Sequence, residues 1–157
     1  NVAILAPQSF TATSTVTYTD PAATENVINA ASAGSWTLNG SQVRVPYMVV
    51  GGSRFGIIAN VTNHGSKDGS ITLDVWDEAG TKVASNYAAG TSNAGSVTSV
   101  APALLAALGG SPATANKLYF QVTTNVPEND VIVYDAYTDN TTSERAIVNN
   151  DSKVQTK

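Results

Sequence analysis

The chain of 157 residues lacks cysteine, and it has little charge, few aromatic side chains and a single histidine. The absence of cysteine excludes disulfide bonds, thiol catalysis and thiolate metal ligands. Charged residues amount to 13% of the chain, about half the quarter that is usual in soluble domains. The polar surface must therefore consist largely of hydroxyl and amide groups, and copies of the chain repel one another only weakly.

Basic residues and long apolar runs are also scarce. The chain has 8 Lys and Arg against 12 Asp and Glu, and its basic residues stand singly, so no stripe is present that could neutralise nucleic-acid phosphates. No apolar run approaches the roughly 18 residues that a membrane span requires. A first residue Asn1 and one methionine indicate a processed, secreted protein, located outside the cell or on its surface.

Most of the chain alternates with a period of two, which is typical of strands. Thr15–Thr19 is one such stretch, and residues 70–77 form another with Ile71, Leu73 and Val75 on one face. Gly80 then supplies a turn that predicts a returning strand. About eight or nine stretches at regular spacing predict an all-β fold, an antiparallel two-sheet β-sandwich of immunoglobulin-like or jelly-roll-like type.

Two segments carry helix signals, so we expect two short helices beside the strands. Residues 20–31 begin with Asp-Pro and continue with alanine, as the first turn of a helix often does. Residues 101–108 precede Gly109-Gly110, which predicts a crossover helix between the sheets with a glycine C-cap. Strand spacing becomes regular near Ser35, which divides the chain into an N-terminal strand and helix arm over 1–35 and a sandwich over 36–157.

The candidate catalytic groups fit ordinary turn chemistry better than catalysis. His64 lies between Asn63 and Gly65, where histidine is a polar turn residue rather than a base for Ser66. The carboxylates gather in turns, and nothing places two acids opposite each other as glycoside hydrolysis needs. We predict no enzyme, no catalytic residue and no cofactor. Ca²⁺ bound by turn oxygens is an alternative that the sequence leaves open, and no metal-binding residue is assigned.

Trp76 lies on the face of its stretch opposite Ile71, Leu73 and Val75. An exposed tryptophan on a hydroxyl-rich sheet indicates a contact site, for another protein or for a sugar. Asn-X-Ser/Thr triplets, the acceptor sites of N-glycosylation, occur often by chance in a chain so rich in these residues. Glycosylation at Asn39, Asn60, Asn140 and Asn150 is therefore left open.

Several strand and turn segments resemble segments of a known group of proteins. They are Trp36 to Tyr47, Asn60 to Gly69, Asp74 to Gly80, Asn125 to Val131 and Tyr134 to Tyr137. Over about residues 36–150 the chain resembles secreted bacterial proteins with immunoglobulin-like β domains, among them S-layer and extracellular filament subunits. The resemblance implies a structural role at the cell surface, and it carries over no functional residue.

The N-terminus supplies a candidate for how copies join. Val2, Ile4 and Leu5 form a short apolar strand that could pair with the open edge of a neighbouring sheet, or serve as the first strand of its own sandwich. Together with Trp76 they are the predicted assembly contacts. We predict a self-assembling structural protein, a filament, fibre or S-layer subunit whose partner is itself. The alternative is a carbohydrate-binding β-sandwich module in which Trp76 binds cell-surface polysaccharide.

Overall fold

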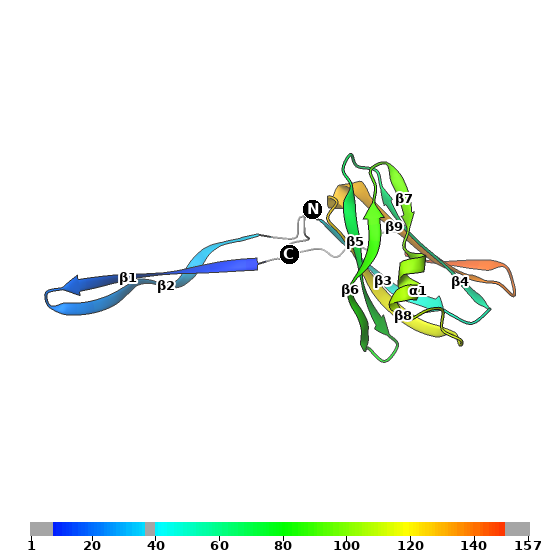
Figure 1. Ribbon diagram of the computed structural model, residues 1–157, viewed down its shortest axis with the longest axis horizontal. Helices are drawn as coiled ribbons and strands as arrows, with labels where there is room; N and C mark the ends of the chain where they lie inside the picture. Colours follow the sequence, from blue (N-terminus) through cyan, green and yellow to red (C-terminus); the bar gives the residue numbers. More distant parts are fainter. Residues whose placement is uncertain (1–7, 37–39, 150–157) are drawn as a thin grey trace. The chain divides into compact units, whose positions relative to one another are not determined.

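The computed structural model describes residues 8–36 and 40–149, and these form two compact units. One unit is a long β-hairpin and the other is a β-sandwich (Figure 1). The predicted N-terminal strand residues Val2, Ile4 and Leu5 lie outside the described residues. Within the described ranges, no helix has the length and apolar character that crossing a membrane would demand.

The hairpin pairs β1 (Gln8–Thr19) with β2 (Ala22–Trp36) in antiparallel register. The strand predicted at Thr15–Thr19 is confirmed, whereas the helix predicted over 20–31 is wrong, because most of these residues form β2. The Asp-Pro pair occupies the turn between the strands, a position that proline also favours. Val27 and Ile28 are β-branched, and such residues favour an extended chain when a second strand lies beside them.

The sandwich consists of two four-stranded antiparallel sheets, which confirms the predicted fold class. One sheet has the order β3-β8-β5-β6 and the other has the order β10-β9-β4-β7. The strands are β3 (Ser41–Val50), β4 (Phe55–Asn63), β5 (Gly69–Asp77), β6 (Lys82–Ser92), β7 (Ser96–Ser99), β8 (Asn116–Thr124), β9 (Val131–Asp139) and β10 (Glu144–Asn149), with a 3-10 turn at Glu128–Asp130.

A short helix, α1 (Ala101–Ala107), carries the chain from β7 in one sheet to β8 in the other. The predicted crossover helix is therefore confirmed. Proline stands in its first turn, where the missing N–H costs nothing. At its end Gly109, with φ of 80°, donates its N–H to the carbonyl oxygen of Ala106, and Gly110 donates to that of Leu105. Glycine ends helices in this way because it adopts the left-handed conformation without strain.

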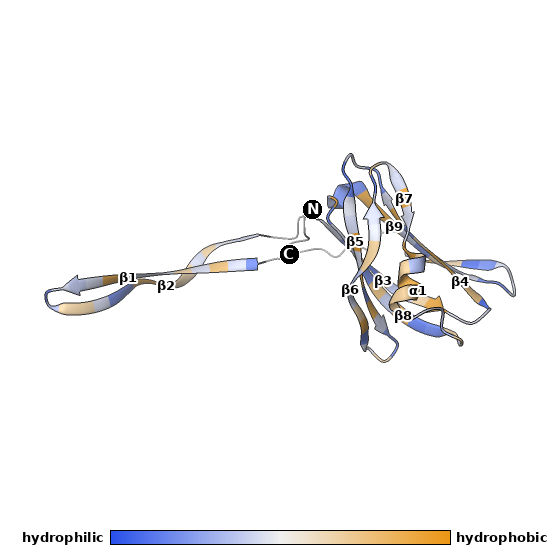
Figure 2. Ribbon diagram, viewed as in Figure 1, coloured by the Kyte–Doolittle hydropathy of each residue, from blue (hydrophilic) through white to orange (hydrophobic). Residues whose placement is uncertain are grey.

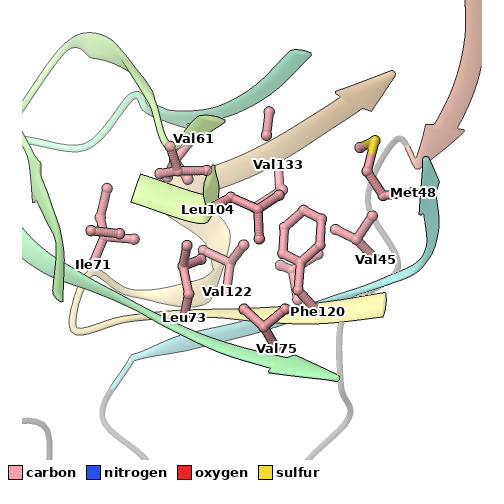
Figure 3. Packing of buried hydrophobic residues seen from close by; sticks show 14 of the residues in the cluster. Val45, Met48, Val61, Ile71, Leu73, Val75, Leu104, Phe120, Val122 and Val133 are labelled. Atoms are coloured by element: carbon pink, nitrogen blue, oxygen red, sulfur yellow. The ribbon is translucent and has the colours of Figure 1, made fainter. Parts of the chain in front are cut away.

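The core lies between the two sheets and is built from alternate residues of the strands. Ile71, Leu73 and Val75 are at most 1% exposed, as their spacing predicted. Phe120 of β8 is fully buried beside them, and Leu104 of α1 reaches into the same cluster (Figure 3). All members of this cluster belong to the sandwich, so the sandwich has a hydrophobic core of its own.

The edge strands of the β3-β8-β5-β6 sheet are irregular. The register of β3 with β8 shifts between Val45 and Met48, where Pro46 stands, because proline fits a sheet only at an edge strand or a bulge. On the opposite edge, β6 contains Asn86 with φ of 49° and Gly90 with φ of 108°, and its register with β5 shifts as well. Such bulges make an edge a poor template for a further strand.

Candidate assembly surfaces

Trp76 lies on the outer face of the β3-β8-β5-β6 sheet, as predicted, but it is only partly exposed. Its indole stacks on Tyr119 of β8, with ring centroids 4.7 Å apart and planes within 5°. From β6, Lys82 Nζ lies 4.8 Å from the Trp76 ring centroid, a cation–π contact. Tyr119 and Lys82 reach the indole from the strands on either side of β5.

This geometry does not favour the carbohydrate alternative at Trp76. A sugar ring packs its C–H groups against a free aromatic face, whereas the indole of Trp76 already stacks on Tyr119 and contacts Lys82. Carbohydrate binding and the assembly role of Trp76 both stay predictions.

The charges around Trp76 are paired within the same sheet. Lys82 Nζ lies 3.2 Å from Asp74 Oδ2, and Asp74 Oδ1 accepts a 2.7 Å hydrogen bond from the backbone N–H of Asn86. Lys117 Nζ lies 3.8 Å from Glu78 Oε2. Exposed ion pairs contribute little to stability, but they keep this outer face charged and hydrated.

The other groups weighed for chemistry serve turns. Asp77 Oδ1 accepts hydrogen bonds from the N–H groups of Ala79 and Thr81. His64 is exposed in the connection between β4 and β5, and its backbone N–H donates to the carbonyl oxygen of Asp130. Within residues 8–36 and 40–149, no three His, Asp or Glu side chains gather as a metal site would need. Binding of Ca²⁺ stays an untested prediction.

An ion pair joins the β3–β4 turn to the end of β9. Arg54 donates from Nε and Nη2 to Asp139 Oδ2, at 2.9 and 2.6 Å. This hydrogen bond, aided by the backbone N–H of Thr141, lowers the pKa of Asp139 to about 2, and the same pair raises the pKa of Arg54. General acids and bases need a pKa near the working pH. Neither partner can therefore exchange protons near neutrality, and the pair is structural.

The Arg54–Asp139 pair predicts a specific acid sensitivity. The pKa of Asp139 falls from 3.8 to about 2 on folding, so the contribution of this carboxylate is complete above about pH 4 and is lost as the pH falls toward about 2. We expect Asp139→Asn to lower the urea midpoint at neutral pH, and the gap to the unmodified chain to close toward pH 2. A gap that stays constant from pH 7 to pH 2 would contradict this assignment.

The β1–β2 hairpin leaves nearly all of its side chains exposed. Phe10 is half-buried against Trp36, with ring centroids 4.6 Å apart, and the other described hairpin residues are exposed. Val27 is 61% exposed and Tyr18 48%. Figure 2 shows hydrophobic segments on both strands. A two-stranded hairpin is marginally stable alone in water, so a surface that covers its apolar side chains would stabilise it. This hairpin was not predicted from the sequence, because a helix was predicted for much of β2.

The chain thus combines a weakly charged β-sandwich with a hairpin whose apolar side chains are exposed. The family described as S-layer protein Slr4 matches residues 1–145, and the chain belongs to this family. Membership confirms the resemblance to S-layer proteins and makes the chain a structural protein of the cell surface. The match includes the N-terminal residues that the resemblance left out. No curated protein and no solved structure matches the chain.

Proposed function

We propose that the chain is a subunit of a surface layer that polymerises with copies of itself, and that the β1–β2 hairpin is the arm that joins them. The observation that carries this proposal is the exposure of a hairpin with strands of 12 and 15 residues. The two outer edges of such a hairpin present N–H and C=O groups to further strands. Its exposed Tyr18 and Val27 present apolar area as well.

The energies available from the arm are sufficient for association. Each fully buried large apolar side chain contributes about 1.5–3 kcal/mol, and each backbone hydrogen bond contributes about 0.5–1.5 kcal/mol. Association costs about 4–15 kcal/mol in lost translational and rotational freedom. Val16, Tyr18 and Val27 are 38%, 48% and 61% exposed, so burying them contributes about half of the full value each, and together with several hydrogen bonds this reaches the lower part of that cost. Growth adds the same contact again at every copy.

The arm is suited to an open polymer. A contact between the hairpin of one copy and the body of the next is heterologous, so it need not close after two copies. The hairpin carries only Asp20 and Glu25 as charged residues, and low charge keeps repulsion between copies small. The predicted fibre and the layer both use such a contact, and membership of an S-layer family favours the layer.

Replacement of residues 8–36 by a short Gly/Ser linker tests the proposal. We expect the unmodified chain to form polymers and the replaced chain to be a folded monomer, because the core of the sandwich contains no hairpin residue. Light scattering after size exclusion measures the assembly, and electron microscopy distinguishes sheets from fibres. Far-UV circular dichroism checks the fold. Polymers formed by the replaced chain would refute the hairpin as the arm.

A chain that lacks residues 1–7 is the matched control, because it keeps the hairpin and removes Val2, Ile4 and Leu5, the residues of the predicted N-terminal strand. We expect this chain to polymerise if the hairpin joins the copies. Loss of polymers in this chain, with polymers retained after replacement of residues 8–36, would assign the junction to strand exchange by the N-terminus instead.

A further inference from the structure

The outer face of the β10-β9-β4-β7 sheet carries exposed aliphatic side chains among hydroxyl and amide groups and is nearly uncharged; we call it the apolar sheet face. Residues that alternate with the buried Val131 and Val133 point outward on β9, and the strand register places their neighbours on the same face. Two registered rows contain the aliphatic residues. One row joins Ile147, Ala136 and Ile58 across β10, β9 and β4, and the other joins Ile132, Thr62 and Val97 across β9, β4 and β7. Between them lies a mixed row of Tyr134, Asn60 and Ser99.

Three aliphatic side chains in these rows are exposed to solvent. Ile147 and Val97 are each 63% exposed and Ile132 is 43% exposed, whereas Ala136 is fully buried between its row neighbours. Exposed aliphatic side chains that gather on one sheet face indicate a candidate protein contact. The outer face of the other sheet differs, since it carries Asp74 and Lys82 as an ion pair.

Arg145 is the one charged residue among those that the structure describes on this apolar face. It lies on β10 beside Thr138 of β9. Three other sandwich cations pair with carboxylates, namely Arg54, Lys82 and Lys117. Among the described residues no carboxylate forms an ion pair with Arg145, and Arg145 is exposed, so an acidic group of a second copy can reach it.

The tip of the hairpin has two different faces. Register places Val16 opposite Glu25 and Tyr18 opposite Ala23, so these residues share one face. The opposite face carries hydroxyl and amide groups, including Thr15, whose Oγ1 lies 3.0 Å from Asn26 Oδ1. One face of the tip is therefore apolar with a single carboxylate. The apolar sheet face offers a match, because it carries exposed aliphatic side chains and a single guanidinium.

We propose that the apolar sheet face of one copy receives the hairpin tip of a second copy, with Glu25 beside Arg145. This inference rests on the proposed function and names the surface that receives the arm. Four strands span about 15 Å at about 4.8 Å per strand, whereas a 12-residue strand extends about 40 Å, so the tip can cross the whole sheet. Facing sheets pack about 10 Å apart with interdigitated side chains, which would bury Tyr18 against the two rows.

Charge reversal in the full chain tests the pairing. We expect Arg145→Glu and Glu25→Arg each to raise the concentration needed for polymerisation by about tenfold or more, because like charges then face each other. The double variant should return it to within about threefold of the unmodified chain, since the pair is restored with reversed sign. Arg44→Glu, on the other sheet, makes the same change of net charge and should have little effect.

The absence of cysteine allows a direct test that the contact joins different copies. A chain with Glu25→Cys is mixed with a chain with Arg145→Cys, under mild oxidation, and mixed disulfide dimers are measured on a non-reducing gel. We expect efficient crosslinking in the mixture and at least tenfold less when Thr24→Cys replaces Glu25→Cys, because Thr24 lies on the opposite face of the hairpin and Cβ atoms must approach within about 4.5 Å.

The outcomes separate the two proposals. If Arg145→Glu polymerises like the unmodified chain while the chain with residues 8–36 replaced stays monomeric, the hairpin is the arm but this face does not receive it. If the double reversal fails to restore polymerisation, or Thr24→Cys crosslinks as well as Glu25→Cys, the pairing of Glu25 with Arg145 is wrong. If the unmodified chain does not polymerise, the proposed function and this inference both fail.

Discussion

Phe120→Ala is expected to lower the free energy of unfolding of the sandwich by about 3–5 kcal/mol, because truncating a buried phenylalanine loses its transfer energy and leaves a cavity. Phe120 is fully buried, and register places it between Val45 of β3 and Val75 of β5. Figure 3 shows its ring in the middle of the labelled side chains. Since domains are stable by about 5–15 kcal/mol, this one change removes a large share of the total.

Tyr119→Ala is the matched control, one residue away on the opposite face of β8. Tyr119 is 36% exposed and stacks on Trp76, so its truncation should cost only about 0.5–1.5 kcal/mol from the lost aromatic pair, with some lost burial. Urea unfolding followed by circular dichroism measures both variants. Equal losses for the two would mean that Phe120 is not at the centre of the core.

Gly51→Ala should destabilise the sandwich by about 2–5 kcal/mol, for two reasons that add. Gly51 has φ of 86°, a conformation that costs other residues about 1–2 kcal/mol. A Cβ built there lies 2.6 Å from the carbonyl oxygen of Pro112 and 2.8 Å from that of Thr114, and relieving such overpacking costs about 1–3 kcal/mol more. The backbone must move, because both neighbours are carbonyl groups of the α1–β8 connection.

Gly80→Ala separates the two causes. Gly80 has φ of 81°, and a Cβ there has no atom within 4 Å. We therefore expect a loss of about 1–2 kcal/mol from the left-handed backbone alone. The difference between the two variants, measured by urea unfolding under identical conditions, reports the crowding at Gly51. If Gly80→Ala costs as much as Gly51→Ala, close approach to the α1–β8 connection is not what requires glycine.

The elements that local signals determine could be predicted from the sequence. α1 has proline at its start and two glycines at its end, and both act within one turn of the chain. The alternation of Ile71, Leu73 and Val75 likewise requires only that one face of β5 be buried. These signals need no knowledge of which strand lies next to which, so the fold class followed from them and the structure confirms it.

The errors arose where a distant strand decides the outcome. Residues 20–31 have a helix-like composition, but β1 offers them a hydrogen-bonding edge, and cross-strand pairing outweighs weak helix propensity. The environment of Trp76 was missed for a similar reason. Its outward direction followed from alternation, whereas Tyr119 and Lys82 cover it through a register that periodicity does not reveal.

The pairing order of the strands determines when the apolar sheet face can exist. The hairpin pairs residues that are close in sequence, so it can form within microseconds as soon as residues 8–36 are available. The sheet face that we propose as its receptor depends on β4 pairing with β9 from Phe55 to Asp139, and on β10 completing the row. Such long-range pairing is slow. In the proposed polymer, an incomplete chain would therefore carry an arm but no receptor, and a further copy could join it only after β10 has paired with β9.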